Sequence, residues 1–134
     1  MANIADIEGI GPAYAAKLVE AGVNSVEALL EQGATASGRT AIETKTGIAH
    51  ALVLKWVNHA DLFRINGIAG QYAELLEAAG VDTVAELAQR NAANLTVKLK
   101  EVNDEKNLAG STPSETVVEK WITEAKSLPK VIQH

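Results

Sequence analysis

Apolar residues recur every three or four positions along most of the chain, which is the spacing that gathers them on one face of an α-helix. The clearest run contains Leu52, Val53, Trp56, Val57, Ala60 and Phe63. Nowhere do apolar and polar residues alternate for long enough to predict a β-strand. The pattern therefore predicts an all-α fold.

The helical pattern occurs twice. A shift of 58 positions superposes IEGIGPAY at residues 7–14 on INGIAGQY at residues 65–72. Farther along, a shift of 65 superposes the run around Trp56 on the run around Trp121, so the second copy has seven extra residues between these blocks. This self-similarity predicts a duplicated unit within one compact protein. The two copies are expected to span residues 1–64 and 65–134.

In the first copy, proline, glycine and capping residues divide the pattern into four helices. Pro12 suits the opening turn of a helix, where its missing N–H would have no partner, and Gly22 ends that helix. Thr40 and Glu43 have the spacing of a capping box, which predicts a helix from Thr40 to Thr46. The other helices are expected at residues 25–32 and 52–63, and the latter should be the longest.

The second copy repeats these helices with different caps. Thr83 and Glu86 form another capping box. Thr112, Pro113 and Glu115 are predicted to supply the N-cap, the first-turn proline and the acidic third residue of the last helix. The remaining two helices carry apolar residues at 72–76 and 95–102.

A turn built on two glycines precedes the first helix of the first copy. Gly9 and Gly11 permit a tight turn, and Ile10 between them anchors it in the core. Such a turn exposes backbone N–H groups beside a helix N-terminus, where they can hold a phosphate oxygen without reading a base. Lys17 on the same helix could reach a neighbouring phosphate, whereas Glu8 would oppose it. The structural alternative is that the glycines only let two helices pack closely.

A second candidate turn leads into the long helix of the first copy. It contains Lys45, Thr46 and Gly47, and Arg39 and Lys55 are nearby in the sequence, so positive charge is concentrated there. The second copy has only a helix cap at the corresponding position.

The glycine turn of the second copy is a weaker candidate. It keeps Gly67, but Ala69 stands where the first copy has its second glycine. The helix that follows carries Glu74 and Glu77 and no Lys or Arg. The first copy is therefore the preferred binding site. The candidate nucleic-acid-binding residues are Gly9, Ile10, Gly11, Lys17, Lys45, Thr46, Gly47, Lys55 and, in the second copy, Gly67.

The segment IEGIGPAYAAKLVEAGV at residues 7–23 is similar to the helix-hairpin-helix motif of DNA repair and recombination proteins. From Ile4 to Val131 the chain resembles the bacterial DUF4332 family, whose biochemical role is not established. The segments that carry this resemblance are IEGIGPAYAAKL, TGIAHALVLKWVNHADLFRI and PSETVVEKWITEAKSL. The resemblance implies two tandem helix-hairpin-helix repeats with a SAM-like arrangement of helices.

The resemblance also implies roles for particular residues. Gly9 and Gly11 would contact phosphate through their backbone, and the carbonyls of the turn would hold a monovalent cation. Gly67 matches the motif in the second repeat, but Ala69 departs from it. That departure argues against a phosphate contact in the second repeat.

Composition narrows the class of protein. The 134 residues include 47% hydrophobic residues, enough to build a core, and the lack of cysteine excludes disulfides and thiolate chemistry. The N-terminus has no signal-peptide pattern, and no apolar run approaches the ~20 residues of a membrane span. We therefore expect a cytoplasmic protein with no membrane partner.

The charge balance opposes strong nucleic-acid binding. Twelve Lys and Arg against 17 Asp and Glu give a net charge of −5, and both copies share the excess of acid. Affinity for nucleic acid comes largely from neutralised phosphates, so binding should be weak and strongly dependent on salt unless the cations cluster.

No residue pattern predicts catalysis, a bound metal or a cofactor. His50 and His59 lie nine residues apart on one predicted helix and point to roughly opposite faces, so they cannot share a metal, and both are expected to be solvated or to cap a helix. Trp56 and Trp121 could stack on bases, but each falls on an apolar stripe and is expected to be buried.

Two function classes remain open, and neither is an enzyme. On the first, the chain is a non-catalytic module that binds nucleic acid, preferably DNA, through backbone phosphates and without sequence preference. On the second, it is an interaction scaffold for a protein partner in which the glycine turns are only structural connectors. The net charge favours the second class.

Overall fold

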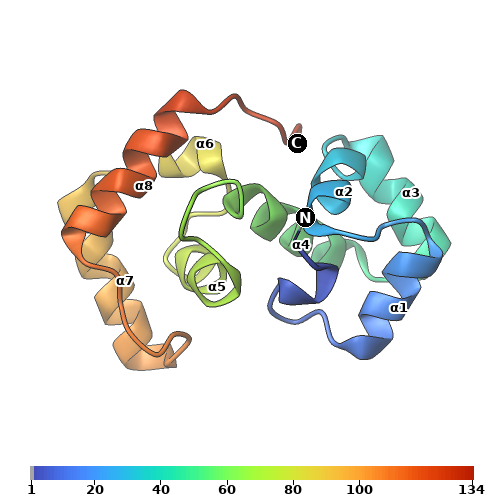
Figure 1. Cartoon of the computed structure of the whole chain (residues 1–134), viewed down its shortest axis with the longest axis horizontal. Helices are drawn as coiled ribbons and strands as arrows, with labels where there is room; N and C mark the ends of the chain where they lie inside the picture. Colours follow the sequence, from blue (N-terminus) through green and yellow to red (C-terminus); the bar gives the residue numbers. More distant parts are fainter. Residues whose placement is uncertain (1) are drawn as a thin grey trace. The chain divides into compact units, whose positions relative to one another are not determined.

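The computed structural model describes residues 2–134, which form eight α-helices and one short 3₁₀ helix (Figure 1). In chain order these are η1 (Ile4–Asp6), α1 (Pro12–Glu20), α2 (Val26–Gln32), α3 (Ala36–Thr46), α4 (His50–Leu62), α5 (Gly70–Ala78), α6 (Val84–Leu87), α7 (Ala92–Lys106) and α8 (Glu115–Ser127). No strand occurs among these residues, although Asn3 and Ser25 form one isolated antiparallel bridge. The predicted all-α fold is therefore confirmed for this range.

The chain divides into two compact units. The first extends through Asp61 and also includes Val131–His134, and the second is Leu62–Lys130. The C-terminal segment is attached to the first unit by a hydrogen bond from the Gln133 N–H to the Ala34 carbonyl at 2.7 Å. The last four residues therefore belong to the first unit, although they follow the second in sequence.

Helices of the two units correspond at the shifts found in the sequence. Both α1 and α5 have 9 residues, and they begin at residues 12 and 70, which differ by 58. Both α4 and α8 have 13 residues, and they begin at 50 and 115, which differ by 65. The second unit is longer in two segments. Its α7 has 15 residues where α3 has 11, and the connector before α8 covers 107–114 where its counterpart covers 47–49.

The predicted start of α3 is wrong. Thr35 rather than Thr40 is the N-cap, because its hydroxyl accepts a hydrogen bond from the Gly38 N–H at 3.1 Å. Thr40 lies inside the helix, where its hydroxyl donates to the Ala36 carbonyl. Both threonines stand in polar sequence that suits a cap, so spacing alone did not distinguish them.

The start of the last helix also differs from the prediction. Ser114, not Thr112, is the N-cap of α8, and its hydroxyl accepts from the Val117 N–H at 3.3 Å. Serine and threonine are both favoured at this position, which explains the error. Among the described helices of the first copy α4 is the longest, as predicted, with 13 residues against 11 for α3, while α7 of the second copy has 15. The cap at Thr83 is confirmed, since its hydroxyl accepts from the Glu86 N–H at 3.3 Å.

A tyrosine packs on a tryptophan in the core of each unit. Trp56 and Trp121 are 1% and 3% exposed, which confirms that both are buried. The ring centroids of Tyr14 and Trp56 lie 5.1 Å apart, and those of Tyr72 and Trp121 lie 5.3 Å apart. Such aromatic pairs contribute about 0.5–1.5 kcal/mol beyond the burial of their area.

The segment before the first glycine turn is tied to α2. The Val26 N–H donates to the Ala2 carbonyl at 3.1 Å, and the Ala2 N–H donates to the two carboxylate oxygens of Glu27 at 3.0 and 3.2 Å. Hydrogen bonds from the N–H groups of Glu27 itself and of Ala2 lower the pKa of Glu27 below its ordinary 4.5.

This tether predicts a small sensitivity to acid. Because the folded-state pKa of Glu27 is lowered, its ionised form stabilises the fold above the ordinary pKa, and this stabilisation is lost as the pH falls through the folded-state pKa. Glu27→Gln should therefore flatten slightly the acid side of the stability curve, measured by urea unfolding between about pH 5 and 3. An unchanged slope would mean that the carboxyl has the same pKa in the folded and unfolded chain.

Candidate functional site

The first glycine turn is a four-residue turn from Ile7 to Ile10. The Ile10 N–H donates to the Ile7 carbonyl at 3.2 Å, and Gly9 has a φ of +92°, a left-handed conformation that favours glycine. Gly11 follows in extended conformation as the N-cap of α1. Ile7 and Ile10 are buried, while Gly9 and Gly11 are exposed. Two buried isoleucines thus anchor the turn, while its glycines are exposed to solvent.

Several backbone N–H groups around this turn have no hydrogen-bond acceptor among residues 2–134. They belong to Glu8, Gly9, Gly11, Ala13 and Tyr14. A shallow pocket of about 340 Å³ lies over the turn and is lined by Ala5, Ile7, Glu8, Gly9, Ile10 and Gly11. Open N–H groups at a tight turn and a helix N-terminus form a site suited to an anionic oxygen.

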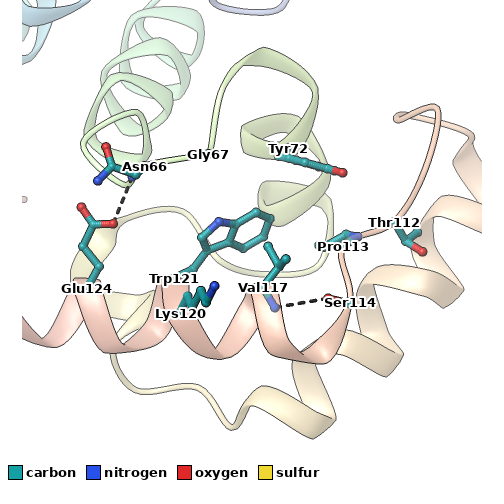
Figure 2. A pocket seen from close by; sticks show the side chains of 10 residues that line it. All are labelled: Asn66, Gly67, Tyr72, Thr112, Pro113, Ser114, Val117, Lys120, Trp121 and Glu124. Carbon is teal, nitrogen blue, oxygen red and sulfur yellow. Dashed lines mark hydrogen bonds between the residues drawn. The ribbon is translucent and has the colours of Figure 1, made fainter.

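The glycine turn of the second unit has the same backbone geometry. The Ile68 N–H donates to the Ile65 carbonyl at 3.1 Å, and Gly67 has a φ of +91°. Ala69 is the N-cap of α5, as Gly11 is of α1. Here one turn N–H is occupied: the Asn66 N–H donates to Oε1 of Glu124 on α8 at 3.1 Å (Figure 2).

The two units differ at the position of that carboxylate. By the shift of 65 that aligns α4 with α8, Glu124 corresponds to His59 in the first unit, and by the shift of 58 Asn66 corresponds to Glu8. His59 is fully buried. The second turn therefore receives an anionic oxygen from its own unit, while the corresponding N–H of the first turn has no acceptor among the described residues.

Each glycine turn also packs closely on its tryptophan. A Cβ added to Gly9 would lie 3.4 Å from Nε1 of Trp56, and a Cβ added to Gly67 would lie 3.3 Å from Nε1 of Trp121. The positive φ of Gly9 and Gly67 favours glycine at both positions, and the tryptophan leaves little room for a larger side chain. An added Cβ at Gly11 meets nothing within 4 Å, so close packing does not account for the second glycine of the first turn.

A protein-family model described as "Domain of unknown function (DUF4332)" matches residues 8–128. The chain belongs to the DUF4332 family. The match includes both glycine turns from Glu8 onward and all the α-helices of the described residues. No curated protein and no solved structure matches the chain.

In this DUF4332 protein the second candidate turn uses its donors internally. The Gly47 N–H donates to the Glu43 carbonyl at 2.8 Å, and the Ile48 N–H donates to the Thr46 hydroxyl at 3.2 Å. The Thr46 hydroxyl in turn donates to the Ile42 carbonyl. Thr46 and Gly47 therefore end α3 and offer no spare donor of this kind to a phosphate.

The basic residues of the first unit differ in their exposure to solvent. Lys17 and Lys45 are exposed, and Lys55 is half-buried. Arg39 is buried, and its guanidinium donates to the carbonyls of Gly33 and Gln133, both at 2.8 Å. The sequence interpretation of Arg39 as part of a positive patch is therefore wrong, because its charge is used inside the first unit.

The histidines lie on opposite faces of α4, as expected, but only one of them is solvated. The side chain of His50 is exposed, and its Nδ1 lies 2.8 Å from Oε2 of Glu43. The expectation of a solvated His59 is wrong, because its side chain is fully buried. Within residues 2–134 no group of three His, Asp or Glu side chains could hold a metal ion.

No helix among residues 2–134 of this DUF4332 protein combines the length and apolar character needed to cross a membrane.

Proposed function

We propose that this DUF4332 protein is a non-catalytic nucleic-acid-binding protein, made of two tandem helix-hairpin-helix repeats, that holds the phosphate backbone of DNA at its first glycine turn. The contrast between the two turns is the main support. In the second unit a carboxylate oxygen of Glu124 accepts the N–H of Asn66 at 3.1 Å. The corresponding N–H of Glu8 has no acceptor among the described residues, although the turn has the same geometry. An anion-binding donor is thus filled in one unit and open in the other.

The helix that follows the first turn adds two favourable features. Gly11 provides no side-chain cap for α1, so the first N–H groups of that helix remain available to a phosphate oxygen. Lys17 is exposed on α1 and can reach a neighbouring phosphate. These contacts read no base, so the proposed binding is independent of sequence.

The charges limit the affinity. Lys17 and Lys45 are exposed and Lys55 is half-buried, in a protein with a net charge of −5, and Glu8 at the turn is exposed. Two to three neutralised phosphates predict a loss of roughly 10- to 40-fold in affinity between about 50 and 200 mM salt. Binding should therefore be weak and easily measured only at low salt.

Gly11→Asp is expected to abolish most of this binding while the protein stays folded. An added Cβ at Gly11 meets nothing within 4 Å, and its φ of −80° and ψ of 179° suit any residue. Aspartate is a preferred N-cap, so its carboxylate should occupy the N–H groups of α1 that would hold phosphate. We expect at least a tenfold loss of affinity, measured by fluorescence anisotropy with labelled duplex, single-stranded and branched DNA and with RNA.

Ala69→Asp provides a matched control, because Ala69 is the N-cap of α5 and the substitution adds the same charge. This variant should bind as the unchanged protein does. Equal weakening by both variants would show that general charge repulsion, rather than the first turn, controls binding. No binding by the unchanged protein at low salt would contradict the proposal.

A scaffold for a protein partner is the second candidate function, and the net charge of −5 favours it. On this proposal the glycine turns only connect helices, so Gly11→Asp should leave partner binding unchanged. A pull-down with the unchanged protein and with Gly11→Asp tests this, and loss of a captured partner in the variant would contradict it.

A further inference from the structure

The second unit contains a pocket of about 600 Å³ beside its glycine turn (Figure 2). The volume is within the range of about 300–1,000 Å³ that is usual for small-molecule sites. Its walls come from the turn, from α5 and α8, and from the long connector that precedes α8. We propose that this pocket binds one nucleotide, either free or as an unstacked unit of a single strand. The site is separate from the phosphate site proposed at Gly11 and does not depend on it.

Part of the pocket lining is apolar and includes two aromatic rings. Figure 2 shows Tyr72, Trp121 and Pro113 around the space, with Val117 between the last two. The Trp121 ring is held by Tyr72 at 5.3 Å between centroids, so this wall is preformed. Val117 is 37% exposed, although most large apolar side chains of the unit are buried. Trp121 is 3% exposed, so the accessible part of this apolar surface belongs mainly to Tyr72 and Val117, and a planar base would cover it.

The lining also contains one cation and one carboxylate that is only partly used. Lys120 and Glu124 lie one turn apart on α8, and both line the pocket. Among residues 2–134 Lys120 has no carboxylate partner. Glu124 accepts the Asn66 N–H with Oε1, and its Oε2 accepts nothing from these residues. The pocket therefore offers a positive charge and a negatively charged acceptor to the same ligand.

A nucleotide matches this combination better than simpler ligands do. An aliphatic chain would offer no partner to Lys120 or to Oε2 of Glu124, and a small inorganic anion would leave the apolar wall exposed. The amino groups of cytosine, guanine and adenine can donate to a carboxylate such as Glu124, while the phosphate can pair with Lys120. Uracil has no amino group and should bind less tightly.

The connector explains why this pocket belongs to the second unit. Thr112, Pro113 and Ser114 line the pocket and lie in the segment 107–114, whose counterpart in the first unit covers only 47–49. Glu124 is likewise replaced by His59 in the first unit. The extra residues of the second copy therefore supply part of a ligand site.

The two tryptophans allow a direct test with the whole protein. We would titrate it with CMP, GMP, AMP and UMP, with cytidine, and with a short oligodeoxycytidylate, and follow the two indole N–H signals by NMR. The Trp121 signal should shift and the Trp56 signal should not, and UMP should bind several-fold more weakly than CMP. Tighter binding of the oligonucleotide than of CMP would identify a single strand as the source, and the reverse would identify free nucleotide.

Two variants assign the polar contacts. Lys120→Gln should lower the affinity for CMP roughly tenfold and leave the affinity for cytidine unchanged, since only CMP has the phosphate. Glu124→Gln should reduce the preference for CMP over UMP. Lys126→Gln, an exposed residue of α8 that does not line the pocket, is the control and should change neither.

The contradicting outcomes are distinct from those of the proposed function. No shift of Trp121 with any nucleotide, or tighter binding of L-phenylalanine than of every nucleotide, would overturn the assignment. Gly11→Asp should not change the affinity for CMP, and Lys120→Gln should not change the affinity for duplex DNA. Failure of the pocket and failure of the first turn can therefore be told apart.

Discussion

Replacing Trp121 with alanine is expected to lower the free energy of unfolding of the second unit by about 3–5 kcal/mol, the usual cost of deleting a buried aromatic side chain. The ring is almost fully buried, packs on Tyr72, and lies 3.3 Å from the position that a Cβ on Gly67 would occupy. Its removal would leave a cavity and would also take away the surface on which the glycine turn rests. The whole unit, rather than one helix, should therefore lose stability.

Urea unfolding by circular dichroism, together with native-state hydrogen exchange of peptides from residues 62–130, would measure this loss. Val97→Ala is the control, because Val97 is exposed on α7 in the same unit and should change stability by no more than about 0.5 kcal/mol. Trp56 remains in the variant and reports on the first unit by fluorescence. A loss under about 1 kcal/mol for Trp121→Ala would mean that the indole is not a core side chain.

Arg39→Met is expected to lower the free energy of unfolding of the first unit by about 3 kcal/mol or more. The buried guanidinium makes two hydrogen bonds at 2.8 Å, to the carbonyls of Gly33 and Gln133. A hydrogen bond to a charged group contributes about 1.5–3 kcal/mol. Methionine has similar length and fills the space, so the loss should report on the hydrogen bonds rather than on a cavity.

A double-mutant cycle with the C-terminal segment tests how Arg39 acts. The second change is a chain that ends at Lys130, which removes Gln133 and the hydrogen bond from its N–H to the Ala34 carbonyl. If Arg39 holds this segment, Arg39→Met should lower the free energy of unfolding by less in the shortened chain than in the full chain. The coupling energy should be about 0.5–3 kcal/mol. Equal costs in the two chains would show that the contact with Gln133 contributes nothing.

The turns illustrate what periodicity and residue type can predict. Gly9 and Ile10 were expected to make a tight turn with an apolar anchor, and the structure has a positive φ at Gly9 and a buried Ile10. The burial of Trp56 and Trp121 was also predicted. These features depend on neighbouring residues and on helical spacing, and both can be read from a single amino-acid sequence.

The errors arose where several residues were equally suitable. Thr35 and Thr40 can both cap a helix, as can Thr112 and Ser114, and the choice depends on where the apolar faces meet the core. Charges were grouped by their distance in the sequence, so Arg39 was placed with Lys45. In the fold Arg39 is buried and Lys45 is exposed. The sequence also gave no signal for the pocket, because its wall joins residues from Asn66 to Glu124.

The sequence by itself determined the helical class, the duplication and the positions of the glycine turns, because these follow from local conformational preferences and from the spacing of apolar residues. Only the tertiary structure decided which polar groups are free. It brings Glu124 to the Asn66 N–H across 58 residues, and it brings the Gln133 carbonyl to Arg39 across 94 residues. Hydrogen bonds between distant segments depend on how the helices pack, and so the difference between the open first turn and the occupied second turn became visible only in the folded chain.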